Sequence, residues 1–308
     1  MLARRRIATA MKPRFANPRY WPSRCGIAML WCVTRLPLAL QLRIGVLIGW
    51  LGLHFATRRR HIAAVNLQLC LPDWSDAARD RLLAATFRSA GISLLETALA
   101  WLRPPDALAH RVTISGIEHL NNALAASKGV LMIGGHFATL DIAGAMLARV
   151  AQFAVTYRPS SDPLFESIMR RARQRLYDGV IAHGDARSIA RRLRAGGAVW
   201  YAADQDFGPR HSVFAPFFGV PAATITAVSR FARMNDSRAV FVSFFRDESP
   251  WRWRIDIRPL TTTFGTDAQE DARLINSLIE AEVRRAPEQY LWLHRRFKTR
   301  PPGETRPY

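Results

Sequence analysis

The sequence predicts an α/β fold, in which a mixed sheet is flanked by helices and preceded by a membrane-associated helix at the N-terminus. Strand-like apolar runs alternate with helical patterns from residue 129 onward, which is typical of a sheet covered on both faces. Residues 26–56 form a long apolar segment with basic flanks. The 308 residues, 49% of them hydrophobic, are enough to bury a large core.

The apolar segment at residues 26–56 predicts that residues 1–60 anchor the protein to a membrane. Arg35, Pro37 and Arg43 interrupt it, and an arginine at the centre of a membrane-spanning helix costs roughly 2.5–3.5 kcal/mol. Both flanks are basic, whereas a spanning helix concentrates positive charge on one side. We expect an N-terminal anchor on the cytoplasmic face, single-pass or monotopic. A buried amphipathic helix of the globular domain is the alternative.

The three cysteines give no sign of a metal site or a disulfide framework. Cys25, Cys32 and Cys70 are odd in number, and their spacing matches no zinc motif. Cys25 and Cys32 are seven residues apart, on one helical face, and we expect them to be small apolar core residues. The cysteine usage indicates a reducing compartment.

Residues 61–308 are expected to form the second domain. It begins with helices over 61–103, where Ser75 is the predicted cap of the longest one and Pro104 ends the region. The predicted strands follow at 129–135, 153–159, 198–204, 239–247 and 251–260. The predicted helices between and after them lie at 139–150, 162–177, 185–195, 221–234 and 267–286. No Gly-rich phosphate loop of the dinucleotide or P-loop type is present.

The net charge of +20 is the strongest bulk signal. Of the 44 basic residues only Lys12, Lys128 and Lys298 are lysine, and the planar arginine side chain suits phosphate and carboxylate recognition. Such a surface attracts nucleic acid, anionic lipid or an acidic carrier protein. A GC-rich genome is the other explanation of the arginine content. A nucleic-acid-binding protein is the weaker hypothesis, because no reading helix or aromatic–basic motif supports it.

A histidine and an aspartate follow the first apolar strand in "GVLMIGGHFATLD". His136 comes directly after Gly134 and Gly135, and Asp141 falls in the first turn or two of the next predicted helix. Sites in α/β sheets open where strands end and helices begin. A spacing of five places the side chains about 140° apart on one ideal helix, so they face each other only if His136 lies in the loop. The segment is then either an ordinary strand-to-helix turn or the site of an acid–base pair, in which Asp141 orients the imidazole of His136.

Several segments resemble the bacterial late acyltransferases of lipid A biosynthesis, of the lauroyl acyltransferase type. "GGHFATLDIAG" is similar to the H-x₄-D/E motif of the wider glycerolipid acyltransferase superfamily. The resemblance extends from about Trp31 to Gly303. It includes "RRRHIAAVNLQLCLP", "YRPSSDPLFESIMRRARQR", "YAADQDFGPRHSVFAPFFGVPAAT" and "PEQYLWLHRRFKTRPPGE".

This resemblance implies roles for particular residues. His136 would be the general base and Asp141 its partner, a position where many relatives carry glutamate. Three arginines would face anionic substrate groups, namely Arg158, Arg173 and Arg175. Asp204 and Asp206 would shape the acceptor site, with Gln205 between them where relatives often carry an aromatic residue or histidine.

The implied reaction transfers an acyl chain from an acyl carrier protein thioester to a hydroxyl of a Kdo-bearing lipid A precursor at the inner membrane. No G-x-S-x-G motif is present, so we expect direct attack, without a cofactor or metal. Phe137, Leu140, Phe217 and Phe218 either line an acyl channel or pack in the core. The expected partners are the carrier protein, the lipid A precursor and anionic inner-membrane lipid, but no nucleic acid. An acyltransferase acting on another glycolipid or a lysophospholipid is the alternative.

Overall fold

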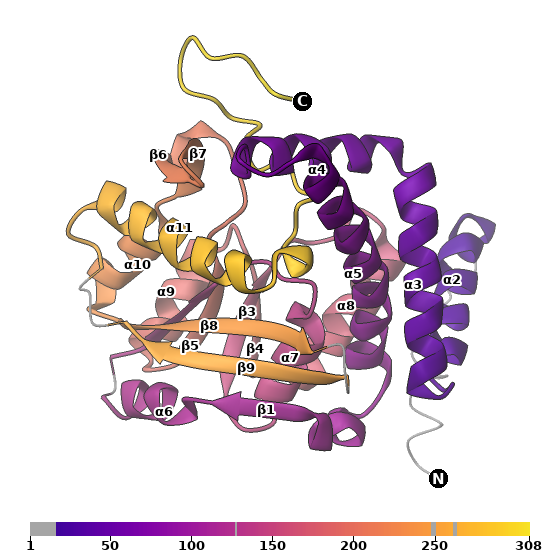
Figure 1. The fold of residues 1–308 in the computed structure, drawn as a ribbon. Coiled ribbons are helices and arrows are strands. Elements are labelled where there is room, and N and C mark those ends of the chain that lie inside the picture. The colour runs from indigo at the N-terminus through magenta and orange to yellow at the C-terminus, as the bar shows by residue number, and fades with distance from the viewer. Residues whose placement is uncertain (1–16, 127, 248–250, 261–263) are drawn as a thin grey trace.

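The computed structural model describes residues 17–126, 128–247, 251–260 and 264–308, and a seven-stranded sheet lies at its centre (Figure 1). The strands are β1 (Val112–Ser115), β2 (Val130–Gly134), β3 (Phe153–Tyr157), β4 (Gly179–Ala182), β5 (Ala198–Ala202), β8 (Arg238–Asp247) and β9 (Arg252–Pro259). Their order is β1-β9-β8-β2-β5-β3-β4. The β8–β9 pair is antiparallel and the other neighbouring pairs are parallel. The predicted mixed α/β sheet is therefore confirmed.

Helices cover both faces of this sheet. In chain order, the helices of the described residues are α2 (Trp21–Val33), α3 (Leu38–Phe55), α4 (Thr57–Cys70), α5 (Asp76–Leu102), α6 (Ile117–Ala125), α7 (Leu140–Leu147), α8 (Pro163–Leu176), α9 (Ala186–Arg194), α10 (Ala227–Asn235) and α11 (Ala268–Arg285). Alternate residues of β2 enter two separate clusters, because successive side chains of a strand point to opposite faces. Val130 and Met132 pack with α7 in one cluster, and Leu131 and Ile133 pack with α9, α10 and α11 in the other.

The long predicted strands are confirmed, but residues 221–225 are not helical. They belong to β7 (Val220–Ile225), which forms an antiparallel hairpin with β6 (Ser212–Phe217). The predicted helix begins only at α10. Ser75 caps α5 as expected, since its hydroxyl accepts a hydrogen bond from the Ala78 amide at 3.3 Å.

The apolar N-terminal segment forms two helices, because α2 ends at Val33 and α3 begins after Pro37, its N-cap. α3 is long and apolar enough to cross a membrane, and only 22% of its apolar window is buried. α5 passes the same test of length and composition but is mostly buried. The expectation that Cys25 and Cys32 are core residues is wrong, because both lie exposed on α2, which has no buried residue.

Glycines bring α3 and α5 into close contact. A Cβ placed on Gly91 of α5 would overlap the Gly45 carbonyl oxygen and the Gly49 amide of α3. A Cβ on Gly45 would come within 2.8 Å of the Ile92 Cα. The backbones of the two helices therefore touch, which side chains at these positions would prevent.

We expect Gly91→Ala to destabilise the fold by about 1–3 kcal/mol, the usual cost of overpacking a well-packed contact. Thermal unfolding in detergent measures the effect. Gly26→Ala is the matched control, because Gly26 also lies in a helix but a Cβ there meets nothing within 4 Å. Alanine should be neutral or mildly stabilising at that position. Equal stability of the two variants would contradict the tight α3–α5 contact.

Candidate active site

His136 lies in the loop between β2 and α7. The loop leaves the sheet through Gly134, where a Cβ would come within 2.6 Å of the Val242 carbonyl oxygen. A glycine here lets β2 end close against β8. The imidazole is 24% exposed, so the ring is held by the protein but open on one side.

The carboxylate that holds His136 is Asp204. Its Oδ1 lies 2.6 Å from Nδ1 of the imidazole, and its Oδ2 accepts a hydrogen bond from the His136 amide at 2.7 Å. The register of the sheet explains this meeting, because Gly134 of β2 pairs with Ala202 of β5. His136 and Asp204 each come two residues after that pair. Parallel neighbouring strands thus bring both side chains to the same edge of the sheet.

Asp204 is a buried but ionised carboxylate. Burial alone would raise its pKa, but the charge of His136, its two hydrogen bonds and the nearby Arg296 lower the pKa to about 2. Tyr290 is buried beside Asp204. Burial, the charge of Asp204 and a hydrogen bond to this carboxylate raise the pKa of the phenol. A carboxylate fixed on Nδ1 selects the tautomer with its proton on Nδ1, which leaves the Nε2 lone pair free.

Asp141 has different partners from those predicted. Its Oδ1 lies 3.2 Å from the Arg173 guanidinium, and its Oδ2 accepts a hydrogen bond from Thr97 at 3.2 Å. The orienting hydrogen bond to Nδ1 of His136 is thus made by Asp204 and not by Asp141. Asp141 and His136 nevertheless line the same groove.

This groove has a volume of about 300 Å³ and runs between α5 and the loop after β2. Thr86, Ala90, Ser93 and Thr97 of α5 form one wall, and their spacing of three or four residues puts them on one helix face. The other lining residues include Phe137, Ala138, Leu140, Tyr290, Leu291 and Leu293. The groove is mainly apolar, and its charged or titratable lining residues are His136, Asp141, Glu288 and Tyr290. It can therefore hold a hydrocarbon chain next to an imidazole.

The C-terminal segment fixes the main chain of the histidine loop. The Ala138 amide donates to the Gln289 carbonyl at 2.7 Å, and the Leu291 amide donates to the His136 carbonyl at 3.1 Å. Gln289 also pairs through its side chain with the main chain of Arg246 in β8. These residues belong to "PEQYLWLHRRFKTRP", whose strong resemblance to the family was the only sequence signal for them.

The other predicted substrate-binding residues are more dispersed. Arg158 is exposed after β3, and Arg175 on α8 is exposed and donates to the Trp101 carbonyl at 2.5 Å. Asp206 is buried and accepts from the amide of Thr299 at 2.8 Å and from its hydroxyl at 2.9 Å. Arg173 is thus the predicted arginine that the structure brings to Asp141.

The aromatic candidates divide between the groove and the core. Phe137 and Leu140 line the groove. Phe217 is fully buried among Phe297, Tyr290 and Phe218, so it packs in the core. Trp200 and Thr97 are additional residues at the site that the sequence analysis did not single out. The rings of Trp200 and His136 lie nearly perpendicular to each other, with 6.2 Å between their centroids.

His294 is a second histidine beside Asp204. Burial lowers its pKa to about 4, with Asp204 opposing this shift and Arg296 and Lys298 adding to it. Its Nε2 accepts a hydrogen bond from the Asp206 amide at 3.4 Å, which requires the neutral ring.

We therefore expect the free energy of unfolding to fall as the pH drops from about 6.5, the ordinary pKa of histidine, towards 4. In this range the unfolded chain takes up a proton at residue 294 that the folded chain does not. His294→Gln should make the pH dependence shallower, and denaturant unfolding at pH 7 and pH 5 measures it. His110→Gln is the control at an exposed histidine. An unchanged slope in His294→Gln would contradict the prediction.

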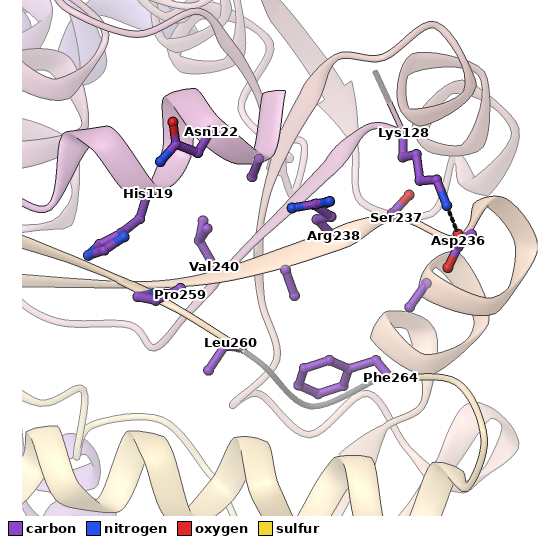
Figure 2. Close-up of a pocket in the computed structure, with 13 residues that line it drawn as sticks. His119, Asn122, Lys128, Asp236, Ser237, Arg238, Val240, Pro259, Leu260 and Phe264 are labelled. Carbon is purple, nitrogen blue, oxygen red and sulfur yellow. Dashed lines mark hydrogen bonds and ion pairs between the residues drawn. The ribbon is translucent and has the colours of Figure 1, made fainter. Parts of the chain in front are cut away.

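A cavity of about 580 Å³ lies at the opposite end of β2 and β8 (Figure 2). Lys128 forms an ion pair with Asp236 across one side of it, and His119 and Asn122 of α6 lie on another. The described residues that line this cavity do not include His136 or Asp204, so the cavity is separate from the candidate active site. Among the described residues, no group of three or more histidine, cysteine or acidic side chains is placed to hold a metal ion.

Comparison with known proteins gives matches over nearly the whole chain. The family described as "Bacterial lipid A biosynthesis acyltransferase" matches residues 8–299. A lipid A biosynthesis palmitoleoyltransferase of Escherichia coli (strain K12) is 37% identical over 295 residues, covering 96% of each chain. A lipid A biosynthesis lauroyltransferase of the same organism is 36% identical over 297 residues, covering 94% of this chain and 97% of the relative. A lipid A biosynthesis acyltransferase of Haemophilus influenzae is 30% identical over 299 residues, covering 96% of each.

Proposed function

Because the chain belongs to the bacterial lipid A biosynthesis acyltransferases, we propose that it adds a secondary acyl chain to a Kdo-bearing lipid A precursor during lipopolysaccharide biosynthesis. The acyl donor in this proposal is an acyl carrier protein thioester, and the acceptor is a hydroxyl on a chain that the lipid already carries. The observation that carries it is a partly exposed imidazole, held by a buried carboxylate, on the lining of a mainly apolar groove.

His136 acts as the general base. With Nδ1–H donating to Asp204, Nε2 is the nitrogen that takes the proton from the acceptor hydroxyl. The alcohol oxygen then attacks the thioester carbon, and the carbon–sulfur bond breaks as the tetrahedral intermediate collapses. The imidazolium returns its proton to the departing thiolate. The charge of Asp204 stabilises the imidazolium while it exists.

Direct attack fits the cysteines of this chain. Cys25 and Cys32 are exposed on α2, and burial raises the pKa of the Cys70 thiol, which keeps it protonated and unreactive. No covalent acyl-enzyme is part of the proposal. A thiol is a good leaving group, so the reaction needs a base more than a strong acid.

Asp141 and Arg173 position the substrates. The Arg173 guanidinium lies 5.6 and 5.7 Å from the ring centroids of Trp101 and Tyr157 and pairs with Asp141, which lines the groove. A guanidinium in this position can bind a phosphate or a developing oxyanion. Arg158 and Arg175 are the more exposed positive charges for the same anionic acceptor, and Asp206 supports the loop after Asp204.

The basic surface suits the proposed setting. The net charge of +20 would attract the phosphorylated acceptor, an acidic carrier protein and anionic lipid at the cytoplasmic face of the inner membrane. α3, with its largely unburied apolar surface, is the proposed anchor.

The proposal is tested by mass spectrometry of lipid A from cells with the gene deleted, and from the same cells expressing the wild type or His136→Ala. We expect the deletion to lower the acyl count by one chain. The wild type should restore that chain and His136→Ala should not, at equal protein levels. An acyl count that does not change on deletion would contradict the function, and rescue by His136→Ala would contradict the mechanism.

A further inference from the structure

Both ends of α3 are packed against the catalytic domain. Near its start, Leu38 packs against the core cluster that contains Val130 and Phe244 of the sheet. Near its end, Leu53 packs against the cluster on the other face of the sheet. The glycine contact with α5 lies between these two points. α3 therefore runs along the side of the domain over its whole length, next to α5 (Figure 1).

This packing is incompatible with a helix that crosses the bilayer. The 18 residues of α3 span about 27 Å, close to the hydrocarbon thickness, so its length alone would allow a crossing. A crossing would, however, carry α5 into the hydrocarbon together with its charged side chains at 80, 81 and 88. The sheet packed behind α5 would follow. Irregular backbone and sheet edges are not tolerated in contact with lipid.

The side of α2 and α3 that faces away from the domain carries a continuous set of exposed apolar residues. On α3, Leu40, Leu47, Leu51 and Phe55 recur at helical spacing and are 41–74% exposed. α2 and the turn after it add Trp21, Met29, Trp31 and Leu36. A cavity of about 800 Å³ between α2 and α8 extends this surface to Leu164 and Ile168. Tryptophan at such positions is typical of the membrane–water interface.

The charged side chains of α2, α3 and the segments that flank them all have one sign, whereas the N-cap of α8 contributes Asp162, which accepts a hydrogen bond from Ser23 at 2.6 Å. Residues 1–72 contain no aspartate or glutamate. Exposed arginines lie before α2, between the two helices, within α3 and after it, at 19, 35, 43 and 58–60. Arg35 stacks on Trp31 at 3.7 Å from the ring. Positive charge at both ends of α3 fits contact with a single anionic leaflet.

From these observations we infer that α2 and α3 lie flat in one leaflet, so that the protein is monotopic and presents one side of its catalytic domain to the membrane. The inference rests on the membrane anchoring in the proposed function and specifies its geometry. The partner of this surface is an anionic lipid bilayer. The apolar face enters the acyl-chain boundary, and the flanking arginines bind lipid phosphates.

Depth measurements along α3 test the inference. Single cysteines at Leu40, Leu47 and Leu51, in a background with Cys25→Ser and Cys32→Ser, carry a fluorophore in vesicles of phosphatidylethanolamine and phosphatidylglycerol. Cys70 is buried and stays in place. Lipids with a quencher near the headgroup or near the chain end report the depth of each label. Val150, 54% exposed in the turn after α7, is the control outside the membrane surface.

We expect all three labels to lie at one shallow depth, roughly 5–10 Å below the headgroups, and the Val150 label to remain unquenched. A spanning helix would give a depth that changes by about 16 Å between residues 40 and 51, and this gradient would overturn the flat orientation alone. Absence of quenching at all three positions would overturn the membrane surface itself. Neither result bears on acyl transfer, which its own assay decides.

Discussion

Asp204→Asn is expected to lower kcat by about 10³–10⁴-fold, the scale of loss when the carboxylate of a catalytic histidine is replaced by its amide. Asparagine keeps the size of the side chain but can donate to Nδ1, which favours the wrong tautomer and moves the proton to Nε2. The buried negative charge that stabilises the imidazolium is lost as well. Initial rates with a carrier protein thioester at saturating acceptor measure this effect.

Asp141→Asn is the comparison that decides which carboxylate acts on the imidazole. It weakens the ion pair to Arg173 but leaves the contact between His136 and Asp204 in place. We expect a loss of about 10–100-fold in kcat/KM, from poorer positioning of the substrate. Thermal unfolding of both variants separates folding defects from catalytic ones. A folded Asp204→Asn with nearly full activity, beside an inactive Asp141→Asn, would return the orienting role to Asp141.

Glu96→Gln is expected to destabilise the protein by about 3–5 kcal/mol, the cost of leaving one buried charge without its partner. Glu96 and Arg246 form an ion pair at 2.7 Å with side chains that are 2% and 0% exposed. Glu96 also accepts from the indole of Trp253 at 2.7 Å, and Arg246 donates to Ser89 at 2.7 Å. This network joins α5 to β8 and β9. It therefore holds against the sheet the same helix that forms one wall of the groove.

Denaturant unfolding of Glu96→Gln measures this effect, and Asp106→Asn is the matched control. Asp106 pairs with Arg149 at 2.7 Å, but its side chain is 80% exposed, and exposed pairs contribute only about 0–1 kcal/mol. A double variant, Glu96→Gln with Arg246→Met, should recover part of the lost stability because it removes the uncompensated charge. Equal losses for Glu96→Gln and Asp106→Asn would contradict the importance of the buried pair.

Much of the fold could be predicted from the sequence because its central strands are strongly apolar. β2 and β5 are buried along their whole lengths, and such runs stand out from the helices around them. The short strands β1 and β4 have only four residues each and no buried residue, so no long apolar run marked them in the sequence. β7 falls inside the predicted helix at 221–234, because Ala222 and Ala223 favour a helix and the strand forms only through pairing with β6.

The site could be predicted only in part. The histidine at the end of a strand and the aspartate at the start of the next helix were readable from local pattern. The contact between His136 and Asp204 was not, because it depends on β2 and β5 being neighbours with Gly134 opposite Ala202. Strand order is set by packing across the whole sheet, and two residues 68 apart in sequence carry no local sign of it.

The exposed cysteines on α2 illustrate a similar limit. Their seven-residue spacing correctly places Cys25 and Cys32 on one helix face. That face is nevertheless exposed, because it lines the open cavity between α2 and α8 and is not packed in the core. A small side chain in an apolar helix can thus lie on the buried face or on the exposed face. Which of the two it occupies depends on what the helix packs against.

The most direct test of the account is acyl transfer by the purified protein in mixed lipid vesicles, with an acyl carrier protein thioester and either a Kdo-bearing lipid A precursor or lysophosphatidate as acceptor. We expect one acyl chain to be transferred to the lipid A precursor. His136→Ala should lower the rate by about 10²–10⁴-fold, the usual contribution of a general base. Transfer to lysophosphatidate alone, or an undiminished rate in His136→Ala, would contradict the account.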